Sequence, residues 1–370
     1  MELVFETKEV VTRLAQVASV VNSKASLPIL DNIMVKASNN TLTMLSSDSE
    51  MWLSINCNLL SCDEIMRFCV NANTLLKALK NLGDCKVTLT IDNKENNLTC
   101  NYGNGYFTLP CISANDFPLP QMDMGGATEK SISNERLLKA MDKTIFAVAN
   151  DDLRMVMNGI HFDFFQESMT CAASDGHKLA MYRDVDVKSD KENSFTMPTK
   201  VCNIARNMLA TTIGDSILMF TDKCVVVKND SFELSSRLID GRYPNYKSVI
   251  PTMHNAMAVV DKASIVGALR RVLPMGSANS ELVSLTFKDN GIKIMAVDFQ
   301  KSASENIPCE YPLRFLPITI GFKGSTLLQL FSNLDGDNAQ IELIDASRAA
   351  IIYDSDKDRY LSLLMPMLLN

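Results

Sequence analysis

The chain is predicted to have an α+β fold made of three homologous domains. Two observations predict this fold. One order of elements, strand–helix–strands–helix–strands, occurs three times along the 370 residues, with a period of about 125 to 130 residues. The helical segments carry apolar residues three and four positions apart, whereas the strand segments alternate apolar and polar residues. The length of the chain is compatible with two to four domains.

Each copy opens with a strand and an amphipathic helix. These openings lie within residues 3–21, 131–149 and 258–275. In the first copy, Val10, Leu14 and Val17 fall on one helix face, which predicts a buried side. The residue types that accept hydrogen bonds at helix N-termini stand before or at each helix. The candidate caps are Thr7, Ser133 and Asp261.

A run of alternating strands follows each first helix, and a second helix comes next. The strand runs lie within residues 32–57, 158–184 and 281–307. Asn39-Asn40 and Asp289-Asn290-Gly291 have the composition of hairpin turns. Each second helix is expected to end at a Gly-Asp pair. Glycine is frequent just past the last helical residue, where it ends the helix. These pairs are 83–84, 214–215 and 336–337, and another strand run follows each.

Linkers divide the three copies. Residues 117–130 are rich in Pro and Gly, and residues 249–256 contain a second break. The expected domains are therefore 1–124, 129–251 and 256–370. The chain has no apolar run of 18 residues and no basic segment followed by an apolar one at its start. A cytoplasmic protein with no membrane partner is expected.

Motifs for metal, nucleotide or covalent chemistry are missing from the sequence. None of the ten cysteines forms a C-x-x-C pair, so buried free thiols are expected, with no metal and no cofactor. No glycine-rich phosphate loop or nucleophile elbow is found. Asp175 and His177 in SDGHKLA could act as an acid–base pair, and a hydrolase using them remains a remote alternative.

Charge is unevenly distributed. The chain has a net charge of −7, which argues against strong DNA affinity from phosphate neutralisation alone. The six helical segments nevertheless hold twelve basic and four acidic residues, a net +8, which leaves −15 for the remainder. The helices could simply have lysine-rich solvent faces, or they could line one surface facing a polyanion.

Five segments together resemble the bacterial sliding-clamp family, the beta subunits of DNA polymerase III. They are LPILDN (27–32), DLRMVMNGI (152–160), ASDGHKLA (173–180), LIDGRYPNY (238–246) and LLMPMLLN (363–370). The resemblance spans the whole chain in order. It implies three clamp domains with helices inside and antiparallel sheets outside, and a ring-shaped head-to-tail homodimer. The implied function is to encircle duplex DNA and to tether the replicative polymerase, without catalysis.

The resemblance also implies a pocket for short peptides of partner proteins. The matching positions are Met157, Ser174, Gly176, His177, Lys178, Leu179, Pro244, Val249, Ala349, Leu363, Met365, Pro366 and Met367. The expected partners are the DNA polymerase III alpha subunit, the clamp loader and repair polymerases. The chain departs from the family at Leu368, where a basic residue is familiar. Taken without the resemblance, LLMPM could also be an ordinary edge strand.

Contacts to DNA and between subunits are expected from the same resemblance and from helix position. The DNA candidates are Lys24, Lys77, Lys80, Lys139, Lys143, Arg154, Lys200, Arg206 and Arg270. Asp151 and Asp152 make the loop beside Arg154 acidic. The dimer candidates are Phe107 and Leu109 on one side, and Val272 and Leu273 on the other. A clamp-fold protein dedicated to repair polymerases is the main alternative.

Overall fold

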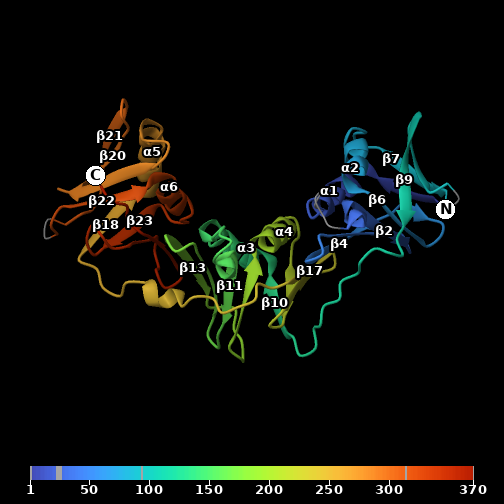
Figure 1. Cartoon of the computed structure of the whole chain (residues 1–370), viewed down its shortest axis with the longest axis horizontal. Coiled ribbons are helices and arrows are strands. Elements are labelled where there is room, and N and C mark those ends of the chain that lie inside the picture. Colours follow the sequence, from blue (N-terminus) through green and yellow to red (C-terminus); the bar gives the residue numbers. More distant parts are fainter. Residues whose placement is uncertain (1, 22–26, 93–94, 313–314, 370) are drawn as a thin grey trace. The chain divides into compact units, whose positions relative to one another are not determined.

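The structure, a computed structural model, describes residues 2–21, 27–92, 95–312 and 315–369. Lys24 therefore lies outside the described residues. The chain divides into two compact units. Unit 1 comprises Met1–Leu138 and Lys200–Ile239, and unit 2 comprises Lys139–Thr199 and Asp240–Asn370. Figure 1 labels some of the elements of each unit.

Unit 1 contains a sheet of 13 strands in the order β10-β15-β16-β17-β4-β3-β2-β6-β9-β8-β7-β1-β5. Its first-repeat strands are β1 (Glu2–Glu6), β2 (Asn32–Ser38), β3 (Thr41–Ser47), β4 (Met51–Asn58), β5 (Ser61–Cys62), β6 (Met66–Asn71), β7 (Lys86–Asp92), β8 (Asn97–Tyr102) and β9 (Gly105–Ser113). Its second-repeat strands are β10 (Thr128–Ser133), β15 (Asp215–Phe220), β16 (Cys224–Lys228) and β17 (Phe232–Arg237).

Unit 2 contains sheets of eight and four strands, in the orders β14-β11-β12-β13-β25-β24-β23-β18 and β21-β20-β19-β22. The second repeat supplies β11 (Gly159–Phe164), β12 (Met169–Ser174), β13 (Lys178–Asp184) and β14 (Asn193–Pro198). The third repeat supplies β18 (Ala256–Asp261), β19 (Leu282–Lys288), β20 (Gly291–Val297), β21 (Ser302–Pro308), β22 (Ile318–Lys323), β23 (Asn338–Leu343), β24 (Ala350–Tyr353) and β25 (Tyr360–Leu364). All the pairings are antiparallel, which confirms the predicted α+β class.

The two junctions between successive repeats use the same kind of strand pair. In unit 1, β17 of the second repeat pairs with β4 of the first, for example Leu234 with Leu53. In unit 2, β25 of the third repeat pairs with β13 of the second, for example Leu363 with Leu179. In both cases the last strand of one repeat pairs with a strand of the preceding repeat. That strand, β4 or β13, directly follows the β2–β3 or the β11–β12 hairpin. The predicted internal repetition is thus present in the sheet topology.

Six α-helices occupy the predicted segments. They are α1 (Thr7–Ala18), α2 (Ala72–Lys80), α3 (Asn134–Asp142), α4 (Thr199–Leu209), α5 (Lys262–Val272) and α6 (Gly324–Ser332). Val10, Leu14 and Val17 are buried on α1, as their spacing predicts. In Figure 1, α1 and α2 lie together within unit 1. None of the helices in the described ranges is long and apolar enough to cross a membrane.

Two of the three predicted helix caps are confirmed. Asp261 accepts the N–H of Ser264 at 2.7 Å, and the Ser133 hydroxyl accepts the N–H of Arg136 at 3.3 Å. Thr7 is wrong as a cap, because it is the first residue inside α1. Its hydroxyl instead donates to the carbonyl of Gly83 at 2.6 Å, so it ties α1 to the turn after α2.

The hairpin turns form where the sequence predicts them. Asn39 and Asn40 have φ angles of 50° and 59°, and Asp289 and Asn290 have 50° and 58°. Asparagine and aspartate tolerate this left-handed region better than most residues, and two such residues form the favoured hairpin turn. The third-repeat turn is therefore Asp289-Asn290, because Gly291 already belongs to β20.

Candidate functional site

The hairpin between β12 and β13 is held by the carboxylate of Asp175. Oδ1 accepts the backbone N–H groups of His177 and Lys178, at 2.9 and 2.8 Å. Oδ2 accepts Nζ of Lys178 at 2.6 Å. Burial acts in the opposite direction, but these hydrogen bonds from Lys178 and His177 keep the pKa of Asp175 below its usual value. Asp175 therefore stabilises the turn and does not orient the His177 ring as a catalytic base.

The hairpin also holds the C-terminal segment. The N–H of Met365 donates to the carbonyl of His177 at 2.8 Å, and the N–H of Met367 donates to the carbonyl of Gly321 at 2.8 Å. Leu363 pairs with Leu179 across β25 and β13. Met365 is 41% exposed. SDGHKLA and LLMPM, almost 190 residues apart in sequence, are therefore neighbours on one sheet.

Below the hairpin lies a buried apolar cluster, which we call the pocket floor. It consists of Ala172, Leu179, Tyr243, Tyr246, Ala349 and Leu363. Val156, Met181 and Ile250 pack against it and are partly buried. Leu179, Ala349 and Leu363, which were expected as pocket residues, are thus brought together, but as a floor and not as exposed walls.

Two tyrosines complete the floor, and the sequence interpretation missed both. The hydroxyl of Tyr243 accepts the N–H of Ser174 at 3.0 Å, and its ring stacks on His161 with centroids 4.5 Å apart. Tyr246 donates to Asp163 at 2.7 Å. Burial raises the pKa of Tyr243 to about 12. The two tyrosines of YPNY, within the motif LIDGRYPNY, are the sequence signal from which this role could have been predicted.

The remaining predicted pocket residues lie in the hairpin or on chain segments that adjoin residues of this floor. Ser174 and Lys178 are half-buried in the hairpin, whereas Gly176 and His177 are exposed. Pro244 and Val249 are exposed on the chain segment that holds the 3₁₀ turn η4 (Tyr246–Val249). Met157 is buried at the end of η3 (Met155–Met157). Pro366 and Met367 are half-buried.

Arg154 lies beside the hairpin. Its Nε donates to Asp151 at 2.8 Å. Gly176 has a φ of +86°, and a Cβ added there would lie 2.6 Å from Nη1 of Arg154. The structure thus places Arg154 next to the peptide-pocket candidates, although the sequence interpretation grouped it with the DNA candidates.

Two of the basic residues predicted on helices are engaged by one carboxylate within unit 2. Lys143 is buried, binds Asp335 at 2.6 Å and also donates to the carbonyl of Asn333. Lys139 binds the other oxygen of Asp335 at 2.9 Å and is 41% exposed. The prediction that Lys143 contacts DNA is therefore corrected, because its ammonium group is enclosed by protein.

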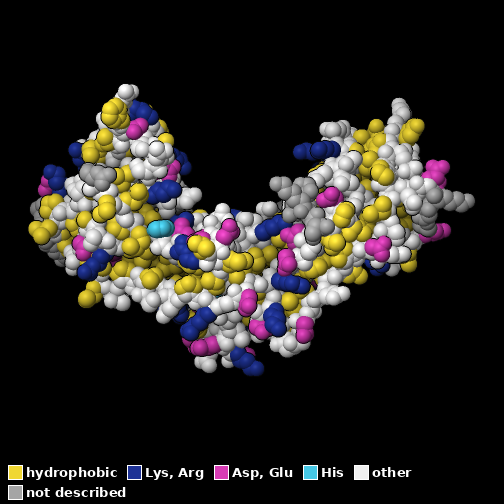
Figure 2. Space-filling view, viewed as in Figure 1, with side chains coloured by type: hydrophobic (Ala, Val, Ile, Leu, Met, Phe, Trp, Pro, Cys, Tyr) yellow, Lys and Arg dark blue, Asp and Glu magenta, His cyan; other side chains and the backbone are white. Residues whose placement is uncertain are grey.

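The other helix cations differ in their availability. Lys200 on α4 pairs with Asp48, within unit 1. Arg206 donates to the side chain of Asn203 at 3.2 Å. Lys77, Lys80 and Arg270 are exposed, and no described carboxylate lies within ion-pair distance of any of them. On the face drawn in Figure 2, basic and acidic side chains are interspersed, so that face has no continuous basic patch among the described residues.

The expected dimer residues also divide into two groups. Phe107 and Leu109 are half-buried on β9. Val272 is 2% exposed at the end of α5, inside its own unit, so the prediction that it contacts a partner chain is corrected. Leu273 is half-buried in η5 (Leu273–Met275) and faces Gly324 at the start of α6.

In the described part of the chain, no group of three or more His, Cys, Asp or Glu residues is placed so that it could hold a metal ion. The ten cysteines are free thiols, of which eight are buried and two, Cys62 and Cys85, are half-buried. The expectation of buried free thiols agrees with this arrangement.

Comparisons with known proteins agree along the whole chain. Family models of the DNA polymerase III beta subunit match residues 1–123 (N-terminal domain), 131–245 (central domain) and 247–368 (C-terminal domain). The beta sliding clamp of Vibrio cholerae is 26% identical over 367 residues, covering 99% of this chain and 100% of the relative. That of Pseudomonas aeruginosa is 27% identical over 370 residues, with the same coverage.

Solved structures give the same result. A crystal structure of the Pseudomonas aeruginosa sliding clamp bound to griselimycin matches with a TM-score of 0.93 and 26% identity, covering 100% of both chains. A Thermotoga maritima DNA polymerase III beta subunit, 21% identical and likewise covered in full, matches in fold with a TM-score of 0.91. The family is a non-catalytic processivity factor, so the hydrolase alternative for Asp175 and His177 is wrong. This chain belongs to the DNA polymerase III beta subunit family, the beta sliding clamps.

Proposed function

We propose that two copies of this chain close head to tail into a ring around duplex DNA, and that the ring tethers a polymerase through a peptide-binding surface. We call this surface the hairpin pocket, and it consists of the pocket floor together with the exposed residues Gly176, His177, Pro244, Val249 and Met365. The proposal rests on two strands that each have one edge without a pairing partner in the described part of the chain. From Gly105 to Pro110, β9 pairs only with β8. Over its whole length, β21 pairs only with β20. Each strand has one edge without a partner among the described strands.

These two edges correspond to the strands that form the internal junctions. β9 is the last strand of the first repeat, as β17 and β25 are of the second and third. β21 follows the long hairpin of the third repeat, as β4 and β13 do in the first and second. Pairing β9 of one chain with β21 of another would repeat the existing junction twice more. A head-to-tail contact that closes in this way gives a ring and not a filament.

The ring model explains how an acidic protein can work on DNA. A ring holds DNA topologically, so strong attraction to phosphates is unnecessary and would slow sliding. Exposed helix cations such as Lys77, Lys80 and Arg270 would supply weak contacts to phosphates that carry no sequence information. Lys24 and Arg206 stay DNA candidates on sequence grounds, as does Lys139 with its charge partly neutralised by Asp335.

The hairpin pocket would bind short peptides of partner proteins. His177, Pro244, Val249 and Met365 are exposed on the segments next to the apolar floor, and Tyr243 and Asp175 hold the hairpin by hydrogen bonds. Methionine is flexible and suits a surface that accepts several different peptides. The partners we propose are the polymerase alpha subunit, the clamp loader and repair polymerases. The cytoplasm is the compartment in which we expect these contacts.

A role confined to repair is not favoured, because the matching models and relatives are named for the replicative subunit and its clamp. For the domain boundaries we propose 1–124, 129–251 and 256–370. The ranges matched by the three family models support boundaries near these positions.

Retention on closed circular DNA tests the ring. The clamp would be loaded on a closed circular duplex by a clamp loader, and salt would be raised before gel filtration. We expect the protein to stay with the circle and to leave when a restriction enzyme linearises it. Equal loss from circular and linear DNA would indicate ordinary electrostatic binding and would contradict the ring.

A proline on the open edge of β9 tests the subunit contact. Tyr102 and Gly105 flank a two-residue turn, so the N–H of Thr108 is on the side of β9 away from β8. Thr108→Pro removes that donor and is compatible with an edge strand. We expect the variant to elute as a monomer at concentrations where the parent is a dimer, with an unchanged circular dichroism spectrum. A dimer of parental stability would exclude this edge.

A further inference from the structure

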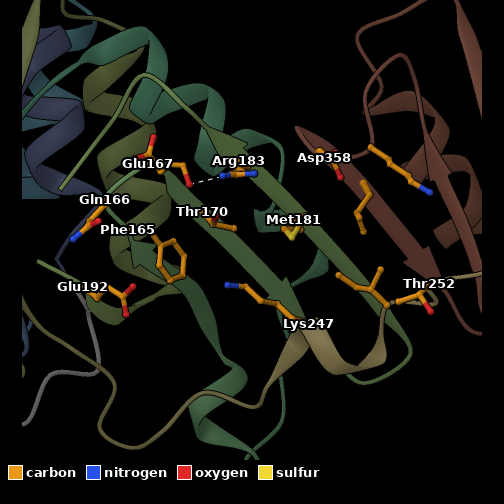
Figure 3. A pocket seen from close by; sticks show the side chains of 14 residues that line it. Phe165, Gln166, Glu167, Thr170, Met181, Arg183, Glu192, Lys247, Thr252 and Asp358 are labelled. Carbon is orange, nitrogen blue, oxygen red and sulfur yellow. Dashed lines mark hydrogen bonds between the residues drawn. The ribbon is translucent and has the colours of Figure 1, made fainter. Parts of the chain in front are cut away.

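A cavity lies on the sheet face that carries Leu179 and the rest of the pocket floor. It has a volume of about 630 Å³ and is open to solvent. We call it the Met181 pocket, and its principal lining residues are Phe165, Met181, Arg183, Lys247, Ile250 and Leu361. Figure 3 labels Phe165, Met181, Arg183 and Lys247 among the side chains that line it. All of them belong to unit 2.

The base of the Met181 pocket is apolar. Met181 and Leu361 pair directly across β13 and β25. Leu361 belongs to a buried cluster with Ile351 and Tyr353, and Met181 and Ile250 pack on that cluster. Phe165 closes the opposite side. An aliphatic side chain placed here would leave water for a surface that is already apolar.

The Met181 pocket adjoins the pocket floor. Met181 and Ile250 pack on both the floor of the hairpin pocket and the cluster around Leu361. Leu179 and Met181 are two residues apart on β13, so they share one sheet face, about 7 Å from each other along the strand. A peptide bound over Leu179 therefore needs only about three to four further extended residues to reach beyond Met181.

Two cations face this apolar base. The ammonium of Lys247 lies 4.2 Å from the centre of the Phe165 ring, and Nε of Arg183 donates to the hydroxyl of Ser168 at 2.9 Å. Neither cation forms an ion pair with a described carboxylate. The third lining cation, Lys357, is already bound to Glu342 at 3.0 Å.

The lining also contains three carboxylates. Figure 3 labels Glu167, Glu192 and Asp358 around the edge of the group of side chains, with Met181 at its centre. The Lys247 chain extends inward toward Phe165. The lining therefore carries both signs of charge, and a carboxylate bound over Met181 would have to lie nearer to Lys247 or Arg183 than to these acidic side chains.

We propose that the Met181 pocket binds the segment of a partner protein that flanks its clamp-binding peptide, through one aliphatic side chain on Met181 and Leu361 and one carboxylate on Lys247. This inference rests on the proposed peptide pocket and extends it. The second contact lengthens the recognised sequence, and it provides a way to rank partners that share the same core peptide.

Binding of synthetic peptides to the whole clamp tests the proposal. The core probe is the clamp-binding segment of the host polymerase subunit, labelled for fluorescence anisotropy. Two longer probes add Glu-Leu-Glu-Leu to its N-terminal or C-terminal end, and matched controls add Gly-Ser-Gly-Ser. We expect one of the two acidic-aliphatic extensions to tighten binding about fivefold or more, and the neutral extensions to have no effect.

Variants of the clamp separate the two pockets. Lys247→Glu should abolish the gain from the extension and leave core-peptide affinity within about twofold of the parent. Lys247→Arg should retain the gain. Lys223→Glu makes the same charge change in an exposed turn of unit 1 and should also retain it.

The outcomes distinguish the two proposals. If the core peptide binds and neither extension adds affinity, the Met181 pocket is not a docking site and the hairpin pocket stands. The same conclusion follows if Lys247→Glu weakens core and extended peptides equally. If the core peptide itself fails to bind, both proposals are overturned.

Discussion

The ammonium group of Lys143 lies 2.6 Å from Oδ1 of Asp335 and 4.9 Å from the centre of the Tyr360 ring. Lys143 follows α3 of the second repeat, and Asp335 follows α6 of the third. Asn333 adds a hydrogen bond from its side chain to the carbonyl of Lys143, at 3.1 Å. A single buried cation therefore joins two repeats within unit 2, beside the β13·β25 junction.

Removal of Lys143 should destabilise unit 2 considerably. We expect Lys143→Ala to lower the free energy of unfolding by about 2 to 3 kcal/mol, because the carbonyl of half-buried Asn333 loses its donor and Asp335 loses its closest cation. Lys139→Ala is the matched control. Since Lys139 is 41% exposed, it should cost less than about 1 kcal/mol. Urea titration of each variant measures the difference, and equal effects would contradict the assigned roles.

The same pair predicts a pH dependence. Burial alone would raise the pKa of Asp335, but hydrogen bonds from Lys143 and Lys139 outweigh it and lower that pKa in the folded protein. The unfolded chain then binds the proton more tightly. The stabilisation is present above the unfolded pKa of about 3.9 and is lost as pH falls through the folded value. Urea midpoints should separate parent and Asp335→Asn at pH 7 and converge below about pH 4. A constant separation would argue against this linkage.

The elements of the fold could be predicted because their signals are local. The spacing of apolar residues on α1 identifies the buried face of that helix. Asn39-Asn40 identifies the turn of the β2–β3 hairpin. Thr7 was misassigned because a helix start is uncertain by a residue, and a threonine one position later can bond elsewhere. The repetition of whole segments then gave the fold class.

The site was less predictable because its contacts are distant in sequence. Lys143 and Asp335 are 192 residues apart, and a lysine on a helix has the same appearance in sequence whether it faces solvent or a buried carboxylate. Val272 likewise follows the helical pattern of a core residue, which the dimer expectation overlooked. The resemblance located the hairpin and LLMPM, but the supporting roles of Tyr243 and Tyr246 required the structure.

Gly176 should matter for peptide binding more than for stability. Its φ of +86° strains any residue with a Cβ, and the new methyl would displace the Arg154 guanidinium. We expect Gly176→Ala to lower stability by about 1 kcal/mol and to weaken core-peptide binding several-fold. Gly126→Ala is the control, because Gly126 has a φ of +74° and open space around it. It should show a similar stability loss with unchanged peptide affinity. If the two variants bound the core peptide with equal affinity, the hairpin would not be part of the peptide-binding pocket.

The thiols should react in two classes. Burial raises the pKa of Cys57, Cys69 and Cys100 to about 12, so their reactive thiolate forms are rare near neutral pH. Only Cys62 and Cys85 are half-buried. Titration of the native protein with a chromogenic disulfide at pH 8 should give two equivalents in a fast phase, with the other eight released on unfolding. If the double variant Cys62→Ser, Cys85→Ser lacks the fast phase, that phase belongs to these two thiols. A fast phase of more than two equivalents in the parent would contradict the burial of the other eight.

Exposed helix cations should determine how binding to DNA depends on salt. Lys77, Lys80 and Arg270 are exposed and lack ion-pair partners among the described carboxylates. Each phosphate contact contributes about 0.9 to the slope of log affinity against log salt, so replacing all three by alanine should reduce the slope on linear duplex by about 2 to 3 per chain. The control replaces Lys223, Lys288 and Lys301, which are exposed, lie outside the helices and carry the same total charge. A reduction in slope with the helix variant alone supports a positive helix surface. The same reduction with both variants would mean that net charge, and not its placement, governs the contact.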